Sequence, residues 1–195
     1  MNDPQRSALP SLLFHGVFAA YHLALGHAAD SRWFLALGVY YLLLSAARFF
    51  TLLLKGNPIL AARVAGGLLL ALALPLAGTV VLSVIRDRGY RLPPVIMIGM
   101  AAYAFTKITI ATVYLVRSRR CASLTSVTLR NLSFADAAVS LFALQRSMLV
   151  SFEGMTPQDI RIMNASTGAA VCAAVLLLGF HLARPRRGSP PPAEE

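Results

Sequence analysis

The chain has 195 residues, of which 57% are hydrophobic and 13% are charged, against about 45–50% and about 25% in soluble domains. So few charges cannot cover the surface of a water-soluble domain, and so apolar a chain is not disordered. The net charge of +10 lies in short clusters between apolar runs, which indicates membrane topology rather than nucleic-acid binding. The composition therefore predicts an all-α, polytopic membrane protein.

The apolar runs predict six membrane crossings, because a bilayer core of about 30 Å needs about 20 apolar residues of helix for each. Two runs are free of charge, and the others contain histidines or charged residues. The crossings are predicted at about 9–29, 33–54, 64–85, 94–116, 129–152 and 162–183. Five crossings are the alternative. Residues 1–183 would form one transmembrane bundle, and the Pro-rich segment 184–195 a disordered tail.

The distribution of Lys and Arg predicts the orientation of this bundle. Nine lie on one side and five on the other, so the positive-inside rule places both termini in the cytoplasm. The first group is Arg6, Lys55, Arg63, Arg117, Arg119, Arg120, Arg184, Arg186 and Arg187, and the second is Arg32, Arg86, Arg88, Arg91 and Arg161. We expect a cell (inner or plasma) membrane protein whose basic cytoplasmic face holds anionic lipid headgroups.

Polar residues at helical spacing mark one face of four predicted helices. In chain order these faces carry His15 and His22, then Tyr41 and Arg48, then Tyr103 and Lys107, and finally a stripe that includes Ser133, Asp136 and Ser140. The third helix contains Pro75, which should kink it. The sixth has Ala165, Ala169 and Ala173 at four-residue spacing, a pattern that lets helices approach closely. The predicted interior of the bundle is therefore polar.

The charged residues of these faces should meet at one depth. Counted from residue 120, Lys107 is about 13 residues up one helix and Asp136 about 16 up the next, or about 20–24 Å at 1.5 Å per residue. Each buried charge costs about 2.5–3.5 kcal/mol, while a leucine returns only about 0.3–0.6. A Lys107–Asp136 ion pair is therefore predicted. Arg48 either joins it or extends toward the inner headgroups.

No cofactor or metal is expected. Haem would need histidines at one depth on different helices, whereas His181 should lie near the cytoplasmic end and His22 deep in the bundle. The cysteines Cys121 and Cys172 have no metal-ligand spacing. The chain also has no HExxH, GxSxG, Walker A or dinucleotide motif, so we expect that it is not an enzyme.

The stretch SVTLRNLSFADAAVSLFALQRSMLVSF (Ser126–Phe152), followed by RIMNASTGAAVC, resembles small multi-pass bacterial membrane proteins that have no assigned activity. The resemblance covers the C-terminal half. It implies a multi-pass bacterial membrane protein and carries over no functional residue.

Two functions fit these residues. The first is a small-solute transporter or channel-like permease with a polar, net-positive site that favours anions. Its candidate residues are Lys107, Asp136, Arg48, Tyr41, Tyr103, Ser133, Ser140 and His22. In it, Asp136 is either a charge partner or a proton-coupled switch. The second is a non-transporting assembly factor, regulatory subunit or sensor whose buried ion pair is structural. Apart from the lipids of the bilayer, the expected partner is a membrane protein or another copy of the chain, not nucleic acid.

Overall fold

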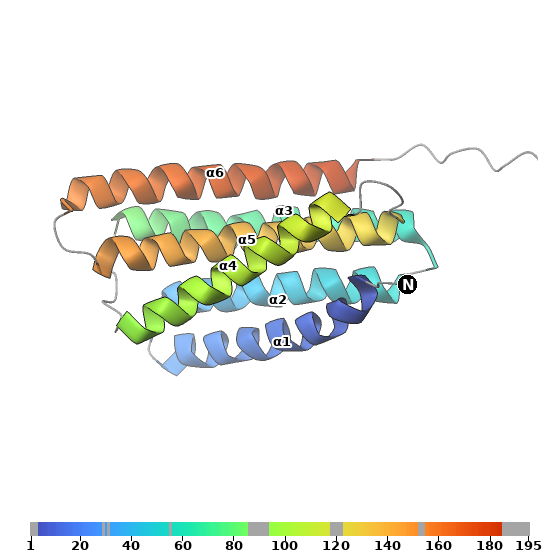
Figure 1. Cartoon of the computed structure of the whole chain (residues 1–195), viewed down its shortest axis with the longest axis horizontal. Helices are drawn as coiled ribbons and strands as arrows, with labels where there is room; N and C mark the ends of the chain where they lie inside the picture. Colours follow the sequence, from blue (N-terminus) through green and yellow to red (C-terminus); the bar gives the residue numbers. More distant parts are fainter. Residues whose placement is uncertain are drawn as a thin grey trace, which may run out of the picture.

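A computed structural model describes residues 4–28, 30, 32–54, 56–85, 94–117, 123–151 and 155–184. These residues form six α-helices and no strand (Figure 1), which confirms the all-α class. The helices are α1 (Pro4–Ala28), α2 (Arg32–Leu53), α3 (Pro58–Ile85), α4 (Pro94–Arg117), α5 (Leu124–Ser151) and α6 (Pro157–Ala183). The predicted tail beyond Arg184 and most of the basic loops lie outside the described residues.

Four helices contain stretches that are long and apolar enough to cross a membrane. They are Leu35–Leu53 in α2, Pro58–Ile85 in α3, Leu124–Leu149 in α5 and Pro157–Ala183 in α6. Within the described residues, α4 has a shorter apolar stretch, Ala104–Val113. Helices α1, α3, α4 and α6 each begin at a proline, which suits the first helical position because the missing N–H would have no intrahelical acceptor there.

Five helices run side by side along the bundle, and α4 crosses obliquely in front of α5 (Figure 1). Helix α5 is central, since it packs against each of the other five. Leu132 and Ala135, on the side opposite the serine stripe, are as inaccessible as Asp136 on the polar side. The sequence predicted that the serine stripe packs inward, and the structure also buries part of the opposite side, where Leu141 remains 40% exposed.

The closest helix contacts rest on glycines. A Cβ added at Gly66 of α3 would lie 2.6 Å from the backbone nitrogen of Ala183 in α6, and one at Gly38 of α2 would lie 2.6 Å from Cγ of Leu23 in α1. The predicted alanine stripe of α6 does not serve this purpose, since Ala169 and Ala173 are exposed. Glycine replaces it because only a missing side chain admits the backbone of the neighbouring helix.

Large apolar side chains cover the outside of the bundle, and a few charged side chains are buried in a core that is otherwise mainly apolar. Large apolar side chains such as Leu74, Val95 and Leu177 are 70–80% exposed, whereas Arg48 and Asp136 are 5% and 3% exposed. Soluble proteins have the reverse arrangement, with charged residues at the surface and almost none fully buried. This surface needs an apolar environment.

The first turn of α6 gives a test of the fold at its surface. Thr156 accepts a hydrogen bond from the Asp159 N–H, and the Asp159 carboxylate accepts one from the Thr156 N–H, which forms a capping box. We expect Thr156→Ala to lower the free energy of unfolding by about 0.5–2 kcal/mol. Denaturation followed by circular dichroism measures it. Thr106→Ala, at an exposed threonine within α4, is the control, and an equal loss there would contradict the capping role.

Candidate functional site

A single carboxylate at the centre of the bundle accepts hydrogen bonds from three basic side chains. Lys107 Nζ lies 2.7 Å from Asp136 Oδ1. The other oxygen, Oδ2, lies 3.2 Å from Arg48 Nη2 and 2.9 Å from His15 Nε2. The four groups come from α1, α2, α4 and α5. We call these four residues the Asp136 cluster.

The cluster is buried, with Lys107 its most accessible member. The side chains of His15, Arg48 and Asp136 are 2%, 6% and 4% exposed, against 14% for Lys107. With His15 neutral, the two cations and one anion sum to a charge of +1. Of the other carboxylates that the structure describes, Asp30 and Asp159 are both exposed. The interior of the described bundle therefore carries excess positive charge.

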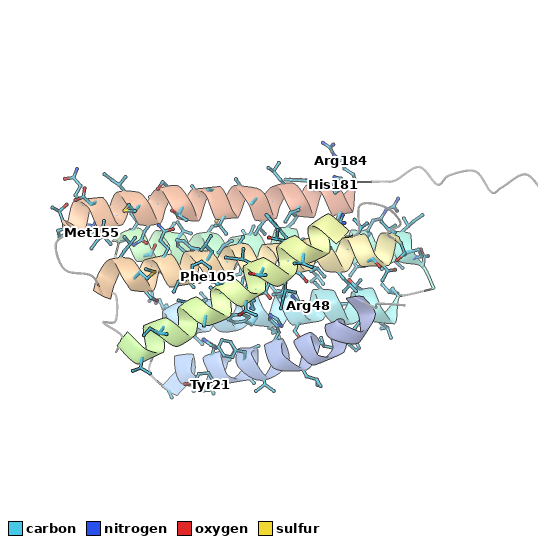
Figure 2. All side chains as sticks on the ribbon, in the orientation of Figure 1. Tyr21, Arg48, Phe105, Met155, His181 and Arg184 are labelled. Carbon is cyan, nitrogen blue, oxygen red and sulfur yellow. The ribbon has the colours of Figure 1, made fainter. Side chains whose placement is uncertain are left out.

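The sequence positions these groups through helical periodicity. Asp136 lies near the middle of α5, the helix that packs against each of the other five. Arg48 is two turns beyond Tyr41 on α2, so both side chains point from one face. Figure 2 shows Arg48 in the middle part of the bundle, between α2 and the crossing α4. Lys107 reaches Asp136 from α4, which packs closely only against α5 among the described helices.

Aromatic rings adjoin the cluster on the side of α1 and α2. The Tyr41 ring lies 5.8 Å from the His15 ring and 5.1 Å from the Phe18 ring, with the second contact edge-to-face. Lys107 Nζ lies 5.9 Å from the Tyr41 centroid, within the range of a cation–π interaction. Tyr41 is thus a wall of the site that favours a cation at Lys107.

Two serines of the α5 stripe have different surroundings. Ser140 Oγ donates to the backbone oxygen of Asp136 at 2.9 Å and lies 3.4 Å from Lys107 Nζ. Ser133 Oγ donates to the backbone oxygen of Leu129 at 3.0 Å. Ser140 therefore touches the cluster, whereas Ser133 bonds to the backbone of its own helix.

The structure brings five of the eight sequence candidates together: Lys107, Asp136, Arg48, Tyr41 and Ser140. Arg48 lies in the interior, so of its two predicted positions the buried one is observed. His22 is set apart from the carboxylate, because its Nδ1 donates to the Phe18 backbone oxygen at 2.8 Å and its ring packs on Phe18 at 4.5 Å. The Tyr103 side chain lies outside the described residues.

His15 is the member of the Asp136 cluster that the sequence did not predict for the site. His15 and His22 share one face of α1, two turns apart, so periodicity treats them alike. In the structure His15 contacts the Asp136 carboxylate, whereas the ring of His22 packs near the ring of Tyr41. The sequence marks both histidines as inward-facing candidates. Which of them meets Asp136 depends on the position of α1 along the axis of α5.

Histidines do not converge elsewhere in the part of the chain that the structure describes. His181 lies at the end of α6 beside Arg184, while Met155 lies at the opposite end (Figure 2). Helix α6 does not pack against α1. No group of three His, Cys, Asp or Glu residues suited to a metal ion is found among the described residues.

The arrangement presents several hydrogen-bond donors to negative charge. Its donors are an ammonium, a guanidinium and an imidazole, aimed at one carboxylate and flanked by hydroxyls. Such donors stabilise negative charge, and they do so more strongly where water is excluded. Comparison of the chain with protein-family models, with curated proteins and with solved structures finds no match.

Proposed function

We propose that the chain is a multi-pass membrane protein whose six helices all cross a cell membrane, with both termini in the cytoplasm. The apolar outer surface of the bundle and its four long apolar helices support this placement. The N-terminal end of α1 and the C-terminal end of α6 lie at the same end of the bundle (Figure 1), in keeping with an even number of crossings. The basic loops of that end would contact anionic lipid.

Within this bundle, we propose a transporter or channel-like permease for a small anionic solute. The observation that carries the proposal is the net positive Asp136 cluster in an apolar surround. Intramembrane ionisable groups are expensive and commonly mark solute or ion pathways. An excess of one positive charge attracts anions and repels cations. Lys107 and Arg48 would attract the solute, and Asp136 would be their resident charge partner.

The position of α4 supports movement of a solute past the cluster. Helix α4 packs closely against α5 alone among the described helices, and α1 packs mainly against α2. Lys107 is therefore the link from α4 to the rest of the cluster. Small shifts of α4 would expose Lys107 on one side of the membrane or the other, as alternating access requires.

The second function is a non-transporting membrane protein in which the cluster only holds the helices together. The three donors that already bind the carboxylate favour this alternative, because a buried ion pair can fix helix packing and do nothing else. Replacing Lys107 by methionine and Asp136 by leucine together distinguishes the two functions. If the cluster is structural, the double variant should still fold into the same bundle. If the cluster is a transport site, the double variant should lose solute flux.

Anion flux into proteoliposomes tests the transport proposal. We expect vesicles that contain the purified chain to take up a labelled anion from a panel of chloride, nitrate, lactate and phosphate faster than protein-free vesicles. Lys107→Met should reduce uptake to the protein-free rate, because it removes the accessible cation of the cluster. Arg161→Met, at an exposed cation of α6, is the matched control and should retain uptake.

Two outcomes would contradict the proposal. One is uptake equal to that of protein-free vesicles for every anion, with the protein folded and correctly inserted. The other is uptake of every solute left unchanged by Asp136→Asn, since a residue within hydrogen-bond reach of all three basic groups cannot be neutral to a solute that binds there.

A further inference from the structure

The two oxygens of Asp136 bind different parts of the bundle. Oδ2 accepts from Arg48 of α2 and His15 of α1, whereas Oδ1 accepts from Lys107 of α4. Helices α1 and α2 pack against each other, while α4 packs closely against neither of them among the described residues. The carboxylate can therefore lose its contact with Lys107 and remain held by Arg48 and His15.

This division also separates the charges. Arg48 and Asp136 form a neutral pair through Oδ2. Lys107 then carries the excess positive charge of the cluster, and it is the most accessible of the four side chains. A buried charge is stabilised by an opposite charge in direct contact. One monovalent anion matches the excess, and a divalent anion exceeds it.

The surroundings of Lys107 supply the rest of a binding site. Ser140 Oγ lies 3.4 Å from Lys107 Nζ, and its hydroxyl can turn from the Asp136 backbone oxygen to donate to an anion. The Tyr41 ring lies 5.9 Å from Nζ, where it favours the charged ammonium. An anion at Nζ would thus contact one charged donor and one hydroxyl donor.

We propose that Lys107 and Ser140 form a binding site for one monovalent anion, which takes the place of Asp136 Oδ1 on Lys107 while Arg48 and His15 keep the carboxylate. Asp136 is then a competitor of the ligand, not one of its ligating groups. The inference rests on the proposed function for its biological meaning, but it concerns binding alone. The ligand is a free inorganic or carboxylate anion, or the phosphodiester of a lipid headgroup, which shares its single negative charge.

The test is an anion titration of the purified full chain in detergent, read as the melting temperature. Sodium sulfate in the buffer is replaced at constant ionic strength by chloride, nitrate or acetate. A separate arm adds short-chain phosphatidylglycerol. For the wild-type chain we expect a saturable rise with a monovalent anion that sulfate does not produce. A response to the lipid alone would support the site and assign it to a headgroup.

Three variants test the competition. Lys107→Met should abolish the response. Asp136→Asn should strengthen binding by about tenfold or more, because it removes a negative charge next to the ligand. Ser140→Ala should weaken binding by about three- to tenfold, the loss of one hydrogen bond. Ser147→Ala is its matched control, since Ser147 lies two turns further along α5 and donates to the Ala143 backbone oxygen.

Each opposite result overturns the inference. These results are a wild-type response no greater with monovalent anions than with sulfate, a response that persists in Lys107→Met, and weaker binding in Asp136→Asn. Ser140→Ala keeps the carboxylate and its three basic partners, so it reports on the site even where Asp136→Asn folds poorly. Binding without flux would retain this site and reject transport. Flux that is insensitive to Ser140→Ala and Asp136→Asn would overturn the site.

Discussion

Replacing Asp136 by leucine should destabilise the bundle more than replacing any other member of its cluster. The substitution leaves Arg48 and Lys107 as two buried cations, and removing one partner of a buried ion pair costs about 3–5 kcal/mol. Lys107→Met should cost less, because Arg48 and His15 still hold the carboxylate. The free energy of unfolding, from denaturant titration in detergent followed by circular dichroism, measures both.

The net charge of the cluster differs between these variants, and it predicts the order of their stabilities. The wild-type sum of +1 becomes +2 in Asp136→Leu and 0 in Lys107→Met, and it returns to +1 in the double variant. We therefore expect the double variant to be more stable than the sum of the single changes, with a coupling of about 0.5–3 kcal/mol. Asp30→Asn, at an exposed carboxylate, is the control. A loss in the double variant equal to the sum of the two single losses would show that the charges are not coupled.

Gly66→Leu should separate α3 from α6. Its Cβ would lie 2.6 Å from the Ala183 nitrogen and 2.8 Å from the Gly179 oxygen. Both are backbone atoms, so neither can rotate away, and one helix must move. Overpacking of this kind costs about 1–3 kcal/mol or more. The loss is measured as the free energy of unfolding, with the melting temperature as a second readout.

The neighbouring residue provides a matched control. A Cβ at Gly67 meets nothing within 4 Å, so Gly67→Leu should be neutral or slightly stabilising because leucine is the better helix former. Equal destabilisation by the two substitutions would contradict the close contact between α3 and α6. The anion response of Gly67→Leu should equal that of the wild-type chain, because the cluster lies on other helices.

The all-α class and much of the buried charged cluster follow from the sequence. Composition favours a membrane protein over a soluble domain, and the run lengths predict six helices, the number that the described residues form. Helical periodicity places Arg48, Lys107 and Asp136 on faces that cannot lie in lipid, and the cost of burying them predicts that they meet. These inferences depend only on spacing along one helix and on transfer energies, which are local properties.

Tertiary packing decided what spacing cannot. His15 rather than His22 meets Asp136 because α1 is seated against α2 through close contacts such as that of Gly38 with Leu23, which fix its axial position. The oblique path of α4 (Figure 1) brings Lys107 to one carboxylate oxygen and leaves the other to Arg48 and His15. Glycines took the place of the alanine stripe between α3 and α6 for the same reason. Axial position, tilt and close approach are set by the fit of two helix surfaces. The residue spacing within a single helix does not specify how a neighbouring helix packs against it.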